Sequence, residues 1–125
     1  MLILFVEYHA AFRQSASYMM GRELDMEVVS QAGSVAEGRR MMAEGGIDAA
    51  IVDVPLPDEG ADVMVEELSR ANPAVLVLVM TSIEGTEVRE RFLGAGANEV
   101  IPKSSSFAEV LAAVRRLGQD GAEEM

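Results

Sequence analysis

The stretch DAAIVDVPLP, residues 48–57, contains the pattern that decides the fold. Four apolar residues, 49–52, lead directly into the acidic residue Asp53, and Pro55 and Pro57 follow. A short continuous apolar run is typical of a strand buried on both faces of a parallel sheet. Proline cannot continue a central strand or a helix interior. The pattern therefore predicts a buried strand with a carboxylate at its carboxyl end.

Similar apolar runs recur on both sides of this strand. Four further strands are predicted, the second in the chain being a mixed edge strand, at residues 2–6, 26–32, 74–80 and 100–101. Amphipathic helical patterns follow each strand, at residues 10–20, 34–44, 61–71, 86–96 and 106–117. The first helix is predicted to bury one face, formed by Phe12, Ala16, Met19 and Met20. Five β–α repeats predict an α/β fold with a parallel sheet and helices on both faces.

The composition indicates one domain of an ordinary globular kind. The chain has 125 residues, 50% of them hydrophobic, and it has no cysteine, which excludes disulfides and thiolate metal sites. No apolar run approaches the ~18–20 residues that span a bilayer, so a cytoplasmic domain without membrane contact is predicted. The net charge of −11 argues against direct contact with nucleic acid. Residues 1–118 are predicted to form the domain, and residues 119–125 a flexible acidic tail.

Polar residues follow four of the predicted strands. In chain order they are Glu7, Tyr8 and His9, then Asp53, then Thr81 and Ser82, and finally Lys103. Because the carboxyl ends of parallel strands meet at one edge of a sheet, two acids, a hydroxyl and an amine are predicted to converge there. A purely structural alternative is an ion pair between Asp53 and Lys103 that closes the top of the core.

Over essentially its whole length, the chain resembles the receiver domains of two-component response regulators. The matching motifs are Glu7 after the first strand, IVDVPLP around Asp53, VMTS around Thr81, and GANEVIPK ending in Lys103. The stretch HAAFRQ also resembles receivers attached to helix-turn-helix output domains. The resemblance implies a doubly wound (βα)5 fold of the flavodoxin-like type, with a five-stranded parallel sheet in the order 2-1-3-4-5.

The resemblance also implies roles for these residues. Asp53 matches the aspartate that accepts a phosphoryl group from a sensor histidine kinase, and a carboxylate can act as such a nucleophile. Lys103 matches the lysine that neutralises the transferring group, and Thr81 matches the hydroxyl residue that senses it. A magnesium ion is implied, with Glu7, Asp53 and the backbone carbonyl of Pro55 as its ligands. The domain would be a signalling switch and no independent enzyme, since it would at most catalyse its own phosphorylation and dephosphorylation.

Three positions depart from the family pattern, the smallest departure being Ser104, where many receivers have proline after the lysine. Tyr8 stands where receivers usually have a second acid that contacts the metal, and a neutral phenol is a poor magnesium ligand, so weak metal binding is predicted. An alternative is that Tyr8 points away while Glu7 and water serve the ion. Val100 stands where an aromatic residue often follows the hydroxyl residue on phosphorylation. Its simplest interpretation is a core strand residue.

The resemblance places signal output on the face formed by the fourth helix, the fifth strand and the fifth helix. A homodimer or an output partner is expected there. Apolar spacing supports this expectation. Four apolar residues of the two neighbouring helices are not expected to fit into one core, so some apolar surface should remain exposed near the edge strand: Val88, Phe92, Val110 and Val114.

Three alternative functions remain open at this point. The first is a pseudo-receiver, a phosphorylation-independent interaction module, for which Tyr8 and Val100 argue. The second is a flavodoxin-like enzyme or nucleotide binder, but the segment EYHAAFR after the first strand is not rich in glycine. The third is a transition-metal site at His9 and Glu7, which lacks a second histidine at ligand spacing.

Overall fold

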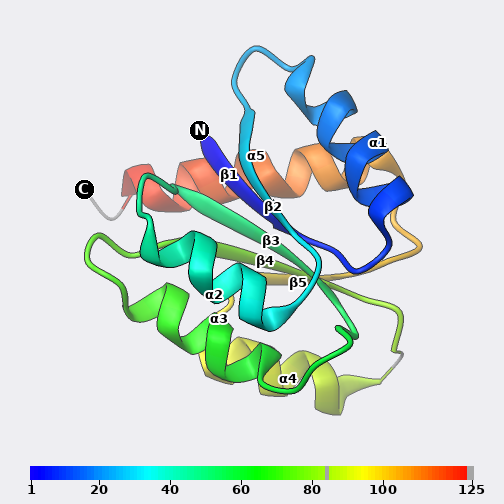
Figure 1. The fold of residues 1–125 in the computed structure, drawn as a ribbon, viewed down its shortest axis with the longest axis vertical. Coiled ribbons are helices and arrows are strands. Elements are labelled where there is room, and N and C mark those ends of the chain that lie inside the picture. Colours follow the sequence, from blue (N-terminus) through cyan, green and yellow to red (C-terminus); the bar gives the residue numbers. More distant parts are fainter. Residues whose placement is uncertain (84, 124–125) are drawn as a thin grey trace.

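The computed structural model describes residues 1–83 and 85–123. Five parallel strands form one sheet in the order β2-β1-β3-β4-β5, which confirms the predicted fold and strand order (Figure 1). The strands are β1 Leu2–Val6, β2 Glu27–Ala32, β3 Ala49–Val54, β4 Leu76–Thr81 and β5 Glu99–Pro102. The helices are α1 Ala10–Gly21, α2 Val35–Ala43, α3 Ala61–Arg70, α4 Thr86–Ala95 and α5 Phe107–Glu123.

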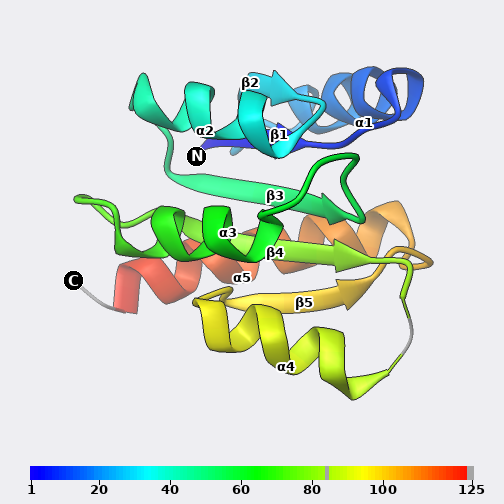
Figure 2. The ribbon, with the colours of Figure 1, turned by 60° about the horizontal axis from the view of Figure 1, so that its bottom comes forward.

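The helices cover both faces of the sheet. Helices α1 and α5 lie on one face, and α2, α3 and α4 lie on the other (Figures 1 and 2). Alternate residues of β1 therefore enter different cores: Ile3 and Phe5 pack with α1 and α5, whereas Leu4 and Val6 pack on the opposite side. This arrangement explains why the central strands are continuously apolar. Strand β2 pairs only with β1 and alternates in exposure, as predicted for an edge strand.

The prediction of an exposed apolar surface on the fourth and fifth helices is wrong. Phe92 is 1% exposed and packs in the core beneath α2, α3 and α4, with Val88 packed against it. Val110 and Val114 are also buried, but in the core beneath α1 and α5. The four side chains do not compete for one core because α4 and α5 cover opposite faces of the sheet.

The prediction that one face of α1 is buried is correct for two of its four residues. Ala16 and Met20 are buried, but Phe12 and Met19 are 44% and 45% exposed. Helical periodicity places the four on one side of the helix, but it does not show how much of that side the sheet covers.

The last helix continues beyond the predicted end of the domain. Helix α5 runs to Glu123, so residues 119–123 of the predicted tail continue it, and residues 124 and 125 lie outside the described part of the chain. The boundary at residue 118 stays a prediction. Within residues 1–83 and 85–123, no helix combines the length and apolar character needed to cross a membrane.

The loop that follows β3 is tied to the start of α2. The Asp58 carboxylate accepts hydrogen bonds from the backbone N–H groups of Val35 at 2.8 Å and Ala36 at 3.0 Å. Ser34 Oγ accepts from the N–H of Glu37 at 3.1 Å. Free N–H groups of a first helical turn need such acceptors. The N–H group of Val35, followed by that of Ala36, lowers the pKa of Asp58 despite slight desolvation.

Asp58→Ala is expected to lower the free energy of unfolding by about 1 kcal/mol, the usual effect of losing a helix cap. Because the pKa of Asp58 is lower in the folded state, this contribution is present above its unfolded value of 3.8 and is lost as the pH falls below that value. Urea unfolding at pH 7 and pH 3 measures both effects. Glu59→Ala, at an exposed neighbouring acid, is the control. An equal loss in both variants would contradict the capping role.

Candidate functional site

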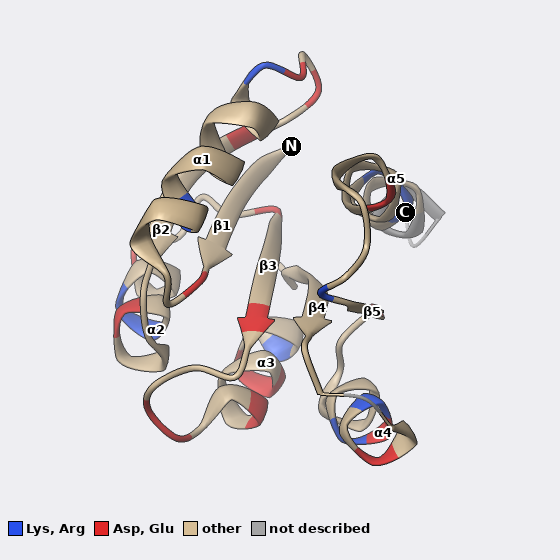
Figure 3. Ribbon diagram, turned by 90° about the vertical axis from the view of Figure 1, so that its right-hand side faces the viewer, with Lys and Arg blue, Asp and Glu red and all other residues tan. Residues whose placement is uncertain are grey.

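Three strands bring two acids and one amine together at the carboxyl edge of the sheet. Acidic residues lie at the ends of β1 and β3, and a basic residue follows β5 (Figure 3). Glu7 and Asp53 are 1% and 2% exposed. Lys103 Nζ lies 3.0 Å from Asp53 Oδ2 and 3.6 Å from Glu7 Oε2. The ion pair expected from the structural alternative is thus present, within a group that also includes Glu7.

Backbone contacts with neighbouring strands position these side chains. The N–H of Glu7 donates to the carbonyl of Ala32 at the end of β2, at 2.8 Å. Asp53 lies inside β3, opposite Met80 of β4. The N–H of Lys103 donates to the carbonyl of Thr81 at 2.8 Å, which ties the end of β5 to the end of β4.

The side chain of Glu7 is held from the first turn after β1. Its Oε1 accepts a hydrogen bond from the N–H of His9 at 3.1 Å and also lies 3.1 Å from His9 Nδ1. The opposite oxygen, Oε2, faces Lys103. Glu7 is therefore oriented by His9 on one side and attracted by an ammonium group on the other.

The two buried carboxyl groups have different electrostatic environments. Burial, and then the proximity of Glu7, raise the pKa of Asp53 to about 7, although Lys103 opposes the shift. Burial also acts to raise the pKa of Glu7, but hydrogen bonds with Asp53 and His9 and the charge of Lys103 outweigh it, so this pKa is lowered. Apart from the Lys103 ammonium, no hydrogen-bond donor among the described residues reaches Glu7 Oε2 or either Asp53 oxygen. A proton on Asp53 supplies one to the pair.

Because the folded state retains the Asp53 proton, we expect this group to make the protein less stable as the pH rises. The folded state keeps the Asp53 proton between its unfolded pKa of 3.8 and its folded pKa of about 7, so the unfolding free energy falls as the pH rises through that range. The opposite contribution of Glu7 acts below its unfolded value of 4.5. Asp53→Asn should therefore gain stability over the wild type, on the order of 2 kcal/mol at pH 8 and little at pH 4.5. Urea unfolding at both pH values measures this difference, and parallel pH curves for the two proteins would contradict it.

The remaining predicted site residues lie around this group. Thr81 ends β4, and its hydroxyl accepts a hydrogen bond from the N–H of Ile83 at 3.0 Å, so it is engaged within its own loop. Ser82 is exposed. Tyr8 is 56% exposed, and its ring packs edge-on to His9 at 5.4 Å between ring centroids. Pro55 follows Asp53 by two residues, after a cis Val54–Pro55 bond.

The structure therefore brings Glu7, Asp53 and Lys103 into contact and leaves Tyr8 at the surface. Among the described residues, no group of three or more His, Cys, Asp or Glu side chains is placed to hold a metal ion. Because Tyr8 carries no carboxylate, a hard cation at this site would have two carboxylates as ligands, those of Glu7 and Asp53.

Two residues of α1 contact the site without having been predicted to do so. The ring of Phe12 lies 5.5 Å from Lys103 Nζ and packs edge-on to Phe5. Arg13 Nη1 donates to the backbone carbonyl of Glu7 at 2.6 Å. Helical periodicity assigns Phe12 to the core and contains no signal for either contact, because both depend on how the start of α1 docks on the end of β1.

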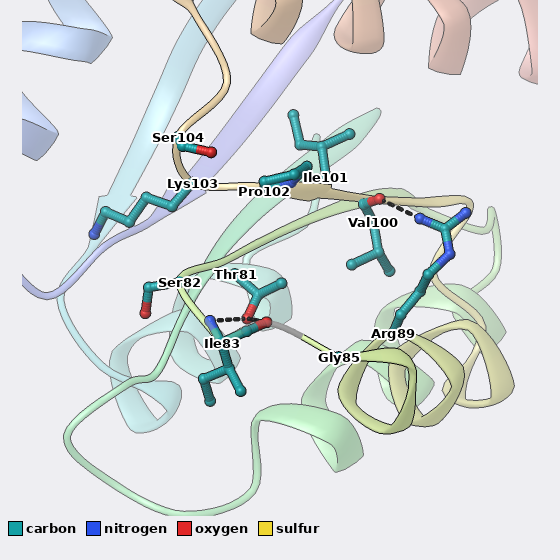
Figure 4. A pocket seen from close by; sticks show the side chains of 10 residues that line it. All are labelled: Thr81, Ser82, Ile83, Gly85, Arg89, Val100, Ile101, Pro102, Lys103 and Ser104. Atoms are coloured by element: carbon teal, nitrogen blue, oxygen red, sulfur yellow. Dashed lines mark hydrogen bonds between the residues drawn. The ribbon is translucent and has the colours of Figure 1, made fainter.

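A cavity of about 560 Å³ lies beside the site, between the ends of β4 and β5 and the start of α4 (Figure 4). Val100 lines it and is 3% exposed, as expected for a core strand residue. Arg89 Nη1 donates to the carbonyl of Val100 at 2.9 Å. The side chain of Lys103 extends away from Val100 and Arg89, so only part of the cavity wall is shared with the acidic site.

Comparison with known proteins identifies the family. A family model described as "Response regulator receiver domain" matches residues 3–115. The chain therefore belongs to the response regulator receiver domain family of two-component systems, and it is a signalling domain.

Several relatives share this domain. The chain is 28% identical, over 93% of its length and 54% of the relative's, to the DNA-binding transcriptional activator DevR/DosR of Mycobacterium tuberculosis. It is 35% identical, over 76% of its length and 42% of the relative's, to the transcriptional regulatory protein CusR of Escherichia coli. The chain thus spans about half the length of these two curated relatives.

Solved structures agree with this fold. A two-component response regulator of the LuxR family from Aurantimonas superimposes with a TM-score of 0.85 at 25% identity, covering 94% of this chain and 85% of that one. A CheY-like receiver domain protein from Methanospirillum hungatei superimposes with a TM-score of 0.87 at 24% identity, covering 98% of this chain and 97% of that one.

Proposed function

We propose that this domain is a phosphorylation-dependent switch in the cytoplasm and accepts a phosphoryl group on Asp53 from a sensor histidine kinase. The observation that carries the proposal is the placement of Asp53. Its side chain is 2% exposed, lies 3.0 Å from the ammonium group of Lys103, and meets no other donor from the part of the chain that the structure describes. A carboxylate in this setting is a nucleophile with its counter-charge already in position.

The transfer uses one carboxylate oxygen of Asp53. This oxygen forms a bond to phosphorus while the bond from phosphorus to the donor breaks, and the donor leaves with that electron pair. Lys103, 3.0 Å from Oδ2, balances the charge on the phosphoryl oxygens as it now balances the carboxylate. Only the ionised form of Asp53 reacts, and Lys103 favours this form against the effect of burial.

Magnesium fits the site as a weakly held ion. Buried carboxylate oxygens without donors are suitable ligands for a hard cation, and we assign them to Glu7 and Asp53, with the backbone carbonyl of Pro55 as a third. When bound, the ion would supply positive charge to the phosphoryl oxygens. Tyr8 adds no carboxylate and is 56% exposed, so the ion would keep more of its water.

The phosphoryl group would change the contacts of Thr81. Its hydroxyl now accepts from the N–H of Ile83 at 3.0 Å and donates to the carbonyl of Ile83 at 3.4 Å. A phosphoryl oxygen on Asp53 would compete with that carbonyl for the hydroxyl hydrogen. The loop between β4 and α4 would then move, and the face formed by α4, β5 and α5 would pass the signal to an output partner or a second copy. Val100 has no ring to follow Thr81, so the loop itself would carry the change.

The output would be genetic control by a partner segment or protein, because DevR/DosR and CusR are named as transcriptional regulators. Direct contact of this domain with nucleic acid is disfavoured by its net charge of −11.

Intact-mass spectrometry after incubation with acetyl phosphate and magnesium tests the proposal. We expect the added mass of one phosphoryl group, and loss of that mass when the metal is chelated before the donor is added. A protein that never gains this mass, from acetyl phosphate or from a histidine kinase, would instead be a phosphorylation-independent interaction module. The absence of a second acid at position 8, where Tyr8 stands, is the observation that keeps this second function under test.

A further inference from the structure

We infer that Arg13 is the positioning residue of the acidic site and that Gly33 lacks a side chain to make room for its guanidinium group. The inference rests on the proposed function only in treating Glu7 as part of the phosphoryl-accepting site. The side chain of Arg13 holds the backbone of Glu7 in place through a hydrogen bond to its carbonyl.

The guanidinium of Arg13 reaches back from α1 to the end of β1. The backbone N–H of Arg13 donates to the carbonyl of His9 at 2.9 Å, which begins the helix. Its side chain crosses this turn, and Nη1 donates to the carbonyl of Glu7 at 2.6 Å. A hydrogen bond from a charged donor is roughly twice as strong as one between neutral groups.

Together with β2, this contact fixes both backbone polar groups of Glu7. The N–H of Glu7 donates to Ala32 of β2, and its carbonyl accepts from Arg13 of α1. The backbone orientation in turn sets the position of the side chain, whose Oε1 meets His9 and whose Oε2 lies 3.6 Å from Lys103. Without the side chain of Arg13, the carbonyl of Glu7 would lose its hydrogen bond to α1, although the backbone link from His9 to the helix would remain.

The guanidinium of Arg13 also limits which side chain fits at Gly33, directly after β2. A Cβ atom at Gly33 would lie 3.0 Å from Arg13 Nη1, a separation at which the guanidinium would have to shift by a few tenths of an ångström. Gly33 is not among the glycines with positive φ, so its backbone conformation does not require glycine. The close approach to Arg13 is therefore the reason for glycine that the structure shows.

The unpaired nitrogen of Arg13 supports a specific role for this contact. Arg13 Nε is buried and has no hydrogen-bond partner within residues 1–83 and 85–123. Burial of an unpaired donor disfavours the folded state. The side chain adopts this position although an exposed orientation would hydrate Nε, and the contact it makes there is with Glu7.

Hydrogen exchange at the His9 amide tests the inference without metal or phosphoryl donor. This N–H donates to Glu7 Oε1, so its protection reports whether Glu7 is in place. We expect Arg13→Gln to lower this protection roughly 10- to 100-fold, the range for loss of a hydrogen bond to a charged group. Gly33→Ala, which would displace the guanidinium without removing it, should lower the protection by less. The double variant should lose no more than Arg13→Gln alone, because both changes act on the same contact between Arg13 and Glu7.

Three controls separate positioning from a general loss of stability. Gly94→Ala repeats the glycine substitution where a Cβ would meet nothing within 4 Å, and it should leave His9 unchanged. The Val77 amide, which donates to Asn98 Oδ1 at 2.8 Å on β4, should keep its protection in every variant. Arg13→Lys keeps a charged donor and should restore part of the protection at His9.

The inference is overturned if His9 exchange is unchanged in Arg13→Gln, if it falls only in parallel with Val77, or if the two substitutions are additive. The phosphorylation experiment has a separate readout. A wild-type protein that takes no phosphoryl group, but shows the predicted exchange pattern, would refute the proposed function and leave the role of Arg13 standing.

Discussion

Asp53→Asn is expected to abolish the phosphoryl mass that the wild type gains from acetyl phosphate and magnesium. An amide lacks the ionisable oxygen that attacks phosphorus, while asparagine preserves the size of the side chain and the packing of β3. Asp53 is also the carboxylate closest to Lys103, at 3.0 Å against 3.6 Å for Glu7. The expected effect is complete loss, measured by intact mass under conditions in which the wild type is labelled.

The matched control is Glu59→Gln, which makes the same chemical change at an exposed acid of the loop that follows β3. It should be labelled like the wild type. The unfolding free energy of Asp53→Asn must be measured alongside, and we expect it to be higher than that of the wild type at pH 8, so loss of label would not reflect unfolding. Label that persists on Asp53→Asn would place the acceptor elsewhere and refute the assignment.

Tyr8→Asp is expected to strengthen magnesium binding roughly 10- to 100-fold, the usual range for a change around a metal site. Tyr8 directly follows Glu7 and is 56% exposed, so an acid can replace it without disturbing the core. The new carboxylate would add a hard oxygen ligand beside Glu7 and Asp53, and it would add repulsion that a divalent ion relieves. NMR titration with magnesium measures both affinities, and labelling by acetyl phosphate should become faster in parallel.

Tyr18→Asp is the control for added charge, because Tyr18 is a 71% exposed tyrosine of α1. It should bind magnesium as weakly as the wild type does. Equal and tight binding by the wild type and Tyr8→Asp would show that Tyr8 is a bystander and that the site is an ordinary metal-binding receiver site. Weak binding by both would show that the site is limited by something other than its number of carboxylates.

The order of strands and helices was predictable from local patterns. Runs such as residues 49–52 are continuously apolar because both faces of the central strands are covered, and the mixed run at 26–32 belongs to an edge strand. The chain positions of Glu7, Asp53 and Lys103 follow from the same patterns, since each lies within two residues of the end of a predicted strand. Parallel strands bring those ends together whatever the details of packing.

Other features depended on which surfaces dock against each other. Helical periodicity shows which side chains share a helix face, but not which core that face meets. Val88 and Phe92 therefore pack on one side of the sheet and Val110 and Val114 on the other, contrary to the prediction. Phe12, predicted to be buried, is instead 44% exposed, with its ring over Lys103.

The contacts that set the properties of the site join residues far apart in the chain. Asp58 caps α2 across 23 residues, and the position of Gly33 beside Arg13 depends on the packing of the end of β2 against the start of α1. The raised pKa of Asp53 likewise requires burial together with Glu7 and Lys103 from two other strands. The sequence alone determined which chemical groups reach the edge of the sheet, because strand length and order are local properties. The tertiary structure decided their protonation, orientation and exposure, because these depend on distances between segments that only folding brings together.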